Sequence, residues 1–152
     1  MIIIKNGDLL KASEDILVHQ VNVAGIMGGG VAKQIAEKYP ITEKEYTEYC
    51  KSAKFKYSNL KGQVLLRKEK GKYIANLFSQ DKFNTDYESM VKGFERIKSY
   101  AIKNNLKIAM PYKIGCGIAN GDWELVLDII IKVFKDYEVT LYFLKCDKNN
   151  KK

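Results

Sequence analysis

Two glycine-rich loops constrain the fold of this 152-residue chain more than any other feature. One loop spans residues 24–30 and the other spans 114–118; each follows an apolar, strand-like run and precedes a helical pattern. A strand, a glycine loop and a helix in that order place backbone N–H groups and a helix N-terminus where they bind phosphate. Two such loops predict a site that holds a diphosphate between them.

Apolar periodicity predicts strands that alternate with helices along the chain. The strands are expected at 2–4, 16–21, 63–66, 72–78, 107–110 and 139–144, with a charged turn at 67–71 joining the third and fourth into a hairpin. The helices are expected at 30–38, from Thr42 to about Ala53, after Thr85 to Asn104, and at 122–134. This alternation predicts an α/β fold with a mixed, mostly parallel sheet and helices on both faces.

Thr42 with Glu45, and Thr85 with Glu88, have the spacing of capping boxes and are predicted to begin two of these helices. In the helix after Thr85, one apolar stripe is expected to face the core; it comprises Tyr87, Met90, Val91, Phe94, Ile97 and Ala101. The helix is expected to end at Asn104 and Asn105. Residues 1–146 are expected to form a single domain, and 147–152 a disordered lysine and asparagine tail.

Several classes of protein do not fit the sequence. The apolar runs fall far short of the roughly 18 residues that a membrane span needs, and no basic region precedes the apolar N-terminal stretch as in a signal peptide. The three cysteines, Cys50, Cys116 and Cys146, lie far apart, so reduced thiols in the cytoplasm are expected. With a single histidine and no ligand spacing, neither a metal nor another cofactor is expected.

The net charge of +8 invites comparison with nucleic-acid-binding proteins. Residues 145–152 hold four lysines and one aspartate and contribute +3 of it, while the other lysines are scattered among acidic residues. Because no basic stripe with interleaved aromatic residues occurs, unmodified nucleic acid is not the expected ligand. A basic surface attracts an anionic small molecule equally well.

The first loop matches neither common nucleotide-binding pattern. Its glycines, Gly25, Gly28, Gly29 and Gly30, do not have the G-x-G-x-x-G spacing, and the lysine and hydroxyl residue of a P-loop are missing. A nicotinamide-dependent dehydrogenase and a nucleoside triphosphatase are therefore not expected.

Three motifs in register resemble the macro domain family. They are KNGDLL at 5–10, VHQVNVAGIMGGGVA at 18–32 and PYKIGCGIANGDWE at 111–124, and a final strand ends at 141–144. Their order and separation extend the resemblance over essentially the whole chain. The similarity is to the branch with ADP-ribose 1''-phosphate phosphatases and terminal ADP-ribose protein hydrolases, and it implies a three-layer α/β/α sandwich with a cleft for ADP-ribose.

The resemblance also implies the ligand-binding residues. Asp8 matches the aspartate that contacts the adenine amine, unless it is an ordinary turn or helix-cap residue. Asn22 matches a position that faces the distal ribose, unless it caps the strand end. Phe143 or Leu144 is expected to cover the adenine, with a plain core role as the alternative. The full expected set is Asp8, Leu9, Asn22, Gly28, Gly29, Gly30, Val31, Ile114, Gly115, Cys116, Gly117, Ile118, Phe143 and Leu144.

Catalytic residues transfer less directly from the family. The glutamate-ester hydrolases of this branch use a lysine and an aspartate, but Gln80 and Ala119 stand at the matching positions, with Lys82 and Asp122 nearby. The candidates for catalysis are His19, Asn22 and Gln80. With an imidazole pKa near 6.5, His19 is expected to deprotonate a water or protonate a leaving group, unless it is a satisfied structural histidine.

The predicted function is binding of ADP-ribose and hydrolysis of a group attached at C1'' of its distal ribose. The expected partner is ADP-ribose or an ADP-ribosylated macromolecule, with no membrane involved. A noncatalytic ADP-ribose reader is the first alternative, favoured by the missing lysine and aspartate. A nucleic-acid-binding module that acts on ADP-ribosylated nucleic acid is the second.

Overall fold

A computed structural model describes residues 1–52 and 60–144, so the predicted tail at 147–152 and the predicted helix end near Ala53 lie outside the described residues. The strands are β1 (Ile2–Asn6), β2 (Ile16–Val21), β3 (Val64–Glu69), β4 (Lys72–Phe78), β5 (Gln80–Asp81), β6 (Asn84–Thr85), β7 (Ile108–Pro111) and β8 (Val139–Phe143). The helices are the 3-10 turn η1 (Leu9–Lys11), α1 (Gly30–Lys38), α2 (Pro40–Ser52), α3 (Tyr87–Asn104) and α4 (Trp123–Val133).

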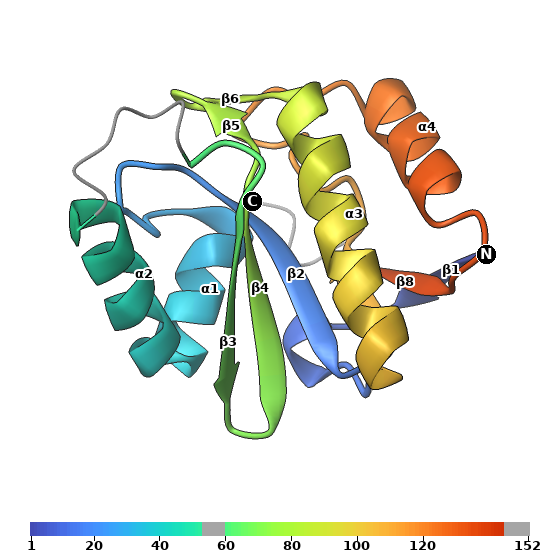
Figure 1. Cartoon of the computed structure of the whole chain (residues 1–152), viewed down its shortest axis with the longest axis horizontal. Helices are drawn as coiled ribbons and strands as arrows, with labels where there is room; N and C mark the ends of the chain where they lie inside the picture. The colour runs from blue at the N-terminus through green and yellow to red at the C-terminus, as the bar shows by residue number, and fades with distance from the viewer. Residues whose placement is uncertain (53–59, 145–152) are drawn as a thin grey trace, which may run out of the picture.

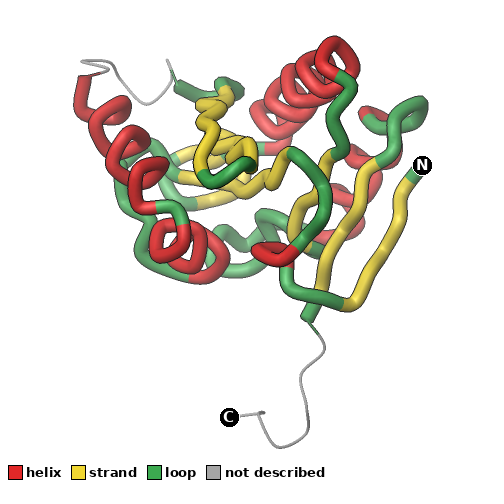
Figure 2. The backbone as a smooth tube through the Cα atoms, turned by 90° about the horizontal axis from the view of Figure 1, so that it is seen from below, coloured by secondary structure: helices red, strands yellow, loops and turns green. Residues whose placement is uncertain are grey.

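The central sheet has the strand order β1-β8-β7-β2-β4-β3. All neighbouring strands in it are parallel except β3 and β4, which form an antiparallel hairpin. Helices α3 and α4 cover one face and α1 and α2 cover the other (Figures 1 and 2), which confirms the predicted three-layer α/β/α sandwich. Within the described ranges, no helix is both long and apolar enough to cross a membrane.

Strand β2 lies inside the sheet and buries side chains on both of its faces. Ile16 and Val18 pack in the cluster beneath α3 and α4, whereas Leu17 packs in the cluster with Ile35 of α1. Because β2 and β7 are adjacent and parallel, the two glycine loops that follow them emerge side by side at the carboxyl ends of the strands. In open α/β sheets, ligands bind at this edge.

Both predicted capping boxes are wrong. Helix α2 begins at Pro40, and the backbone N and Oγ1 of Thr42 donate to Glu69 Oε1 at 2.8 and 2.9 Å. A carboxylate from the neighbouring hairpin therefore supplies the acceptor that the helix N-terminus needs. Helix α3 begins after Asp86, while Thr85 belongs to β6 and uses its hydroxyl elsewhere.

The predicted hairpin is present, but its turn is shorter than expected. Strand β3 continues through Glu69, and only Lys70 and Gly71 turn the chain, with φ values of 52° and 79°. Two central residues at positive φ match the twist of the flanking strands. The charged residues expected in the turn are thus mostly strand residues.

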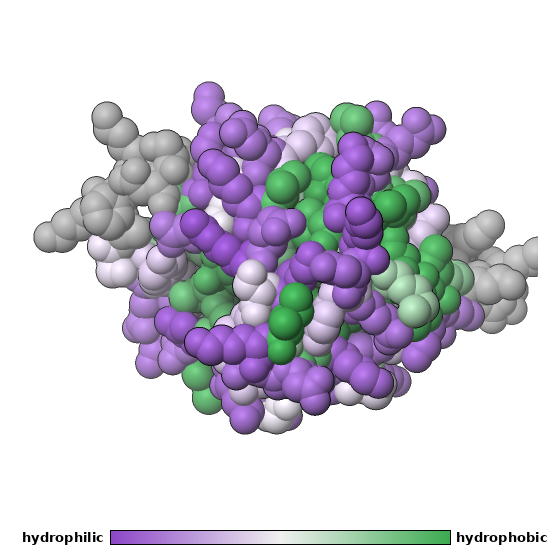
Figure 3. Space-filling view, turned by 45° about the vertical axis from the view of Figure 1, so that its right-hand side comes forward, coloured by the Kyte–Doolittle hydropathy of each residue, from purple (hydrophilic) through white to green (hydrophobic). Residues whose placement is uncertain are grey.

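The outer face of α3 differs from the prediction at one position. Val91 was expected to face inward but is 37% exposed, whereas Gly93 lies against the sheet, where a Cβ would come within 1.9 Å of Leu77 Cδ1. Figure 3 shows apolar side chains on the α3 and α4 side as patches bordered by hydrophilic ones. The helix ends as predicted, at Asn105 in the left-handed conformation.

Candidate functional site

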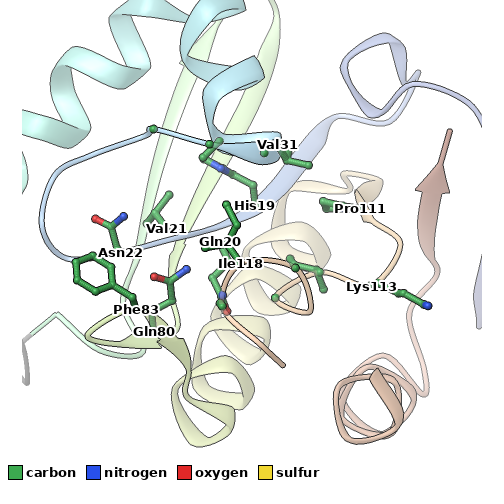
Figure 4. A pocket seen from close by; sticks show the side chains of 18 of the residues that line it. His19, Gln20, Val21, Asn22, Val31, Gln80, Phe83, Pro111, Lys113 and Ile118 are labelled. Atoms are coloured by element: carbon green, nitrogen blue, oxygen red, sulfur yellow. The ribbon is translucent and has the colours of Figure 1, made fainter. Parts of the chain in front are cut away.

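A cavity of about 470 Å³ opens where β2 and β7 end, between the two glycine loops (Figure 4). Its volume is typical of a small-molecule site. The predicted residues that line it are His19, Asn22, Gly28, Gly29, Gly30, Val31, Gln80, Ile114, Gly115, Gly117 and Ile118. Asp8, Leu9, Cys116, Phe143 and Leu144 are not among the lining residues. The structure therefore brings the two predicted loops to one shared gap.

Asn22 holds the first glycine loop from within. Its Oδ1 accepts from Ala24 N at 3.0 Å, and its Nδ2 donates to Ile26 O at 2.9 Å. Tyr46 of α2 donates its hydroxyl to the Asn22 carbonyl at 2.6 Å and to Oδ1 at 2.9 Å. These bonds match the capping role that was the alternative for Asn22. The amide carries one further N–H, so the same side chain can also donate to a ligand.

The second glycine loop is held from outside. The hydroxyl of Thr85 donates to Gly115 O at 2.6 Å, and Gly121 N donates to the same oxygen at 2.8 Å. Gly115 has a φ of +76°, and a Cβ on Gly121 would lie 2.4 Å from the Gly115 oxygen. The loop path therefore requires glycine at both positions.

A chain of side-chain hydrogen bonds supports Thr85. Ser79 Oγ donates to Gln20 Oε1 at 2.5 Å, and Gln20 Nε2 donates to Thr85 Oγ1 at 3.1 Å. Since Thr85 in turn donates to Gly115, each group in the chain has its partner, and the direction of every bond is fixed. Gln20 also lines the cavity, although it was not among the predicted site residues.

The two loops meet at the mouth of the cavity. A Cβ on Gly29 would lie 3.1 Å from Ile118 Cδ1, and Ile118 is 80% exposed. Phe83, in the turn between β5 and β6, also lines the cavity and lies beside Asn22 and Gln80 (Figure 4). Phe83 was not predicted as a site residue, because an aromatic residue in a polar turn gives no periodic signal.

His19 is the fourth of the six residues of β2 and is almost fully buried, at 1% exposure. Its Nε2 is 2.6 Å from Asn76 Oδ1, and Asn76 Nδ2 donates to Leu65 O at 2.9 Å. Burial lowers the pKa of His19 to about 4, although the bond to Asn76 opposes that shift. The expected pKa near 6.5 is therefore wrong, and the imidazole is neutral at neutral pH and unsuited to protonating a leaving group.

The residues expected to bind adenine lie beside the cavity at the same edge of the sheet. Asp8 Oδ1 accepts from Leu10 N at 3.0 Å and caps η1, which was the alternative for Asp8. Phe143 packs against Tyr112, with ring centroids 5.9 Å apart, and Tyr112 lines the cavity. Leu144 is 71% exposed. Phe143 therefore contacts a lining residue without lining the cavity itself.

Neither charged neighbour replaces the missing lysine and aspartate. Gln80 and Ala119 both line the cavity, as their expected positions require. Asp122 accepts from Glu124 N at 2.9 Å and caps α4, and Lys82 is an exposed turn residue outside the lining. Among the described residues, no cluster of His, Cys, Asp and Glu could hold a metal ion. The site can therefore bind an anion and orient water, but it lacks a strong acid–base pair.

Comparison with known proteins agrees with this geometry. The macro domain profile matches residues 18–130. ADP-ribose glycohydrolase OARD1 of Bos taurus is 32% identical over 144 residues, which cover 91% of this chain and 88% of that protein. ADP-ribose 1''-phosphate phosphatase of Lodderomyces elongisporus is 38% identical over 125 residues, covering 72% and 74%.

A solved structure shows the same fold. The macrodomain of Mycobacterium tuberculosis DarG superposes with a TM-score of 0.82 at 25% identity, covering 95% of this chain and 99% of that one. Sequence profile, relatives and structure agree with the resemblance carried by the three motifs. This chain belongs to the macro domain family.

Proposed function

We propose that this protein binds ADP-ribose and hydrolyses a group attached at C1'' of the distal ribose. The observation that carries the proposal is the cavity that the two glycine loops of adjacent parallel strands share. Backbone N–H groups of such loops, together with the N-terminus of α1, bind a diphosphate without any basic side chain. The relatives named as an ADP-ribose glycohydrolase and an ADP-ribose 1''-phosphate phosphatase support the same reading.

The proposed ligand lies across the carboxyl ends of the strands. Its diphosphate lies between 28–31 and 115–118, and its adenine lies toward Asp8 and Phe143, beyond Tyr112. Its distal ribose lies toward Asn22 and Gln80, which line the cavity together with Phe83 (Figure 4). This orientation puts the scissile bond next to the side-chain amides.

Water orientation, rather than strong proton transfer, is the proposed chemistry. Gln80 and the unused N–H of Asn22 are neutral. Buried His19 is a neutral imidazole at neutral pH, and its one N–H is directed at Asn76 rather than at a leaving group. A positioned general acid or base contributes about 10²–10⁴-fold to a rate, so its absence predicts slow turnover. A noncatalytic reader remains the second candidate, because Gln80 and Ala119 stand where the family's charged pair would act.

One experiment separates hydrolase from reader. The protein is incubated with ADP-ribose 1''-phosphate and with glutamate-linked ADP-ribosylated protein, and release of phosphate and of ADP-ribose is followed while calorimetry measures ADP-ribose binding. We expect binding and slow release, with release abolished in Gln80→Ala but kept in Lys82→Ala, a matched control outside the cavity. Binding without release identifies a reader, and absence of binding rejects the proposal.

We further propose a cytoplasmic location, consistent with the free thiols of Cys50 and Cys116.

A further inference from the structure

One buried side-chain atom in the described part of the chain lacks a hydrogen-bond partner: Nδ1 of His19. A buried polar atom without a partner destabilises the folded state, because it has lost its hydrogen bonds to water. Buried polar groups in folded proteins are nearly always paired, so an exception calls for a physical reason. In a residue that lines the cavity, the missing partner can come from a bound molecule.

The hydrogen bonds of Asn76 determine what kind of partner fits. The Asn76 amide nitrogen donates to Leu65 O, so its Oδ1 points at His19 Nε2 and must accept from it at 2.6 Å. Nε2 therefore carries the imidazole proton, and Nδ1 presents a lone pair. The partner that His19 lacks is a hydrogen-bond donor.

The position of His19 narrows the choice of donor further. Its side chain lies beneath the first turn of α1, near Val31 (Figure 4), and Gly30 and Val31 line the same cavity. A phosphate oxygen carries no proton at neutral pH and would face the lone pair unfavourably. A sugar hydroxyl, in contrast, donates readily to a neutral imidazole nitrogen.

We propose that His19 Nδ1 accepts a hydrogen bond from a hydroxyl of the distal ribose, and that Asn76 is the positioning residue that keeps Nδ1 free to accept. This inference rests on the proposed binding of ADP-ribose and adds a specific contact to it. With this contact, the His19 and Asn76 pair distinguishes ADP-ribose from ADP, which lacks the second sugar. An ordered water in place of the hydroxyl is the competing occupant.

Two substitutions of His19 separate the ligand contact from the structural bond. In His19→Gln, the side-chain amide reaches the position of Nε2 and keeps a donor for Asn76, but it offers no acceptor at the place of Nδ1. In His19→Asn, the amide oxygen replaces Nδ1 but the side chain does not reach Asn76. We expect His19→Gln to bind ADP-ribose about fivefold to tenfold more weakly, the effect of one lost hydrogen bond, and to bind ADP unchanged. Equal binding of ADP-ribose by His19→Gln and wild type overturns the inference.

Nuclear magnetic resonance gives a direct readout, because His19 is the only histidine in the sequence. In protein with ¹⁵N-labelled histidine, we expect Nδ1 to resonate as an unprotonated nitrogen and Nε2 as a protonated one. ADP-ribose should move the Nδ1 resonance and ADP should not. Asn76→Leu should mix the two tautomers and weaken ADP-ribose binding, although Asn76 does not line the cavity.

Calorimetry on the same samples separates failure of the inference from failure of the proposed function. If ADP-ribose binds and the Nδ1 resonance stays in place, or moves equally with ADP, the contact is a water or nothing, and the inference is rejected while the proposed function stands. If ADP-ribose does not bind, both are rejected. If Asn76→Leu fails to fold, His19→Gln and the wild-type spectra still decide the outcome.

Discussion

The two walls of the cavity are built in opposite ways. The first wall is the end of β2 with the loop at 24–30, and the second wall is the loop at 114–118 with its support. The first loop is held by its own Asn22 and by Tyr46, whereas the second is held by Thr85, thirty residues away along the chain. The second wall has all these polar partners satisfied, while the first leaves His19 Nδ1 without one.

This difference indicates how the two walls would respond to a ligand. A fully paired network holds its backbone in one conformation whether or not a ligand is bound. A buried acceptor without a partner gains stability only when a donor arrives. We therefore expect the second wall to be preorganised and the first wall to be the one that a ligand stabilises.

The largest expected effect comes from the second wall. Gly121→Ala would place a Cβ 2.4 Å from the Gly115 carbonyl oxygen, so the backbone must shift. We expect the free energy of unfolding to fall by about 2–3 kcal/mol, as for overpacking of a tight site, and ADP-ribose affinity to fall at least about tenfold. Chemical denaturation and calorimetry measure the two effects.

Gly117→Ala is the matched control for this change. It adds the same methyl group four residues earlier, where a Cβ would meet nothing within 4 Å. The control applies to stability, because Gly117 itself lines the cavity. Equal losses of unfolding free energy in the two variants would show that the second loop is not held by close packing.

The second-largest expected effect is at the first wall, where His19 makes the stability of the fold depend on pH. The unfolded chain binds a proton at His19 near pH 6.5, but the folded chain binds it only near pH 4, so acid favours the unfolded state. The stability from the neutral imidazole is complete above about pH 6.5 and is lost as the pH falls toward about 4. We expect His19 to account for a loss of about 2 kcal/mol between about pH 7 and about pH 5.

Urea denaturation at the two pH values measures this loss. His19→Gln should remove it while leaving the contributions of the carboxylates in place. Identical pH profiles for wild type and His19→Gln would contradict a buried, neutral His19.

A smaller effect is expected at the support of the second loop. Thr85→Val keeps the shape of the side chain but removes the donor to Gly115 and the acceptor for Gln20. We expect a loss of about 1.5 kcal/mol in stability and weaker ADP-ribose binding. Thr85→Ser keeps the hydroxyl and should restore affinity, and failure of that rescue would mean that packing, not hydrogen bonding, supports the loop.

The smallest effect is expected at the support of the first loop. Tyr46→Phe removes two hydrogen bonds to Asn22, but Asn22 Oδ1 still accepts from Ala24 N. We expect a cost of about 1 kcal/mol in thermal or chemical denaturation, and only a modest change in ADP-ribose affinity. A larger loss of affinity than in Thr85→Val would reverse the comparison of the two walls.

Much of the fold followed from local patterns. Strand β2 was predicted with the bounds that the structure shows, because the apolar residues 16–18 and Val21 are typical of a strand buried on both faces. The helix starts at Thr42 and Thr85 were mispredicted because their hydroxyls bond to groups distant in sequence, Glu69 and Gly115. Capping signals describe only neighbours along the chain, so they miss an acceptor that arrives from another element.

The candidate site also has features that the sequence predicted and features that it did not. Glycine spacing predicted both loops, because glycine is the residue that adopts positive φ and allows another backbone to approach closely. The protonation state of His19 could not be predicted from the sequence, because its pKa depends on how completely the fold removes water from the ring.

The sequence by itself determined the order of the central-sheet strands, the two glycine loops and the four α-helices, but not the short elements η1, β5 and β6. It also determined where the backbone needs glycine, because these features depend on residues close together in the chain. Tertiary structure alone decided that β7 lies beside β2, so that the two loops share one gap. It also decided that Asn76 pairs with Nε2 of His19 and that Nδ1 is buried without a partner. The pairing of strands and the desolvation of a side chain depend on neighbours in space, and these cannot be predicted from a pattern along the chain.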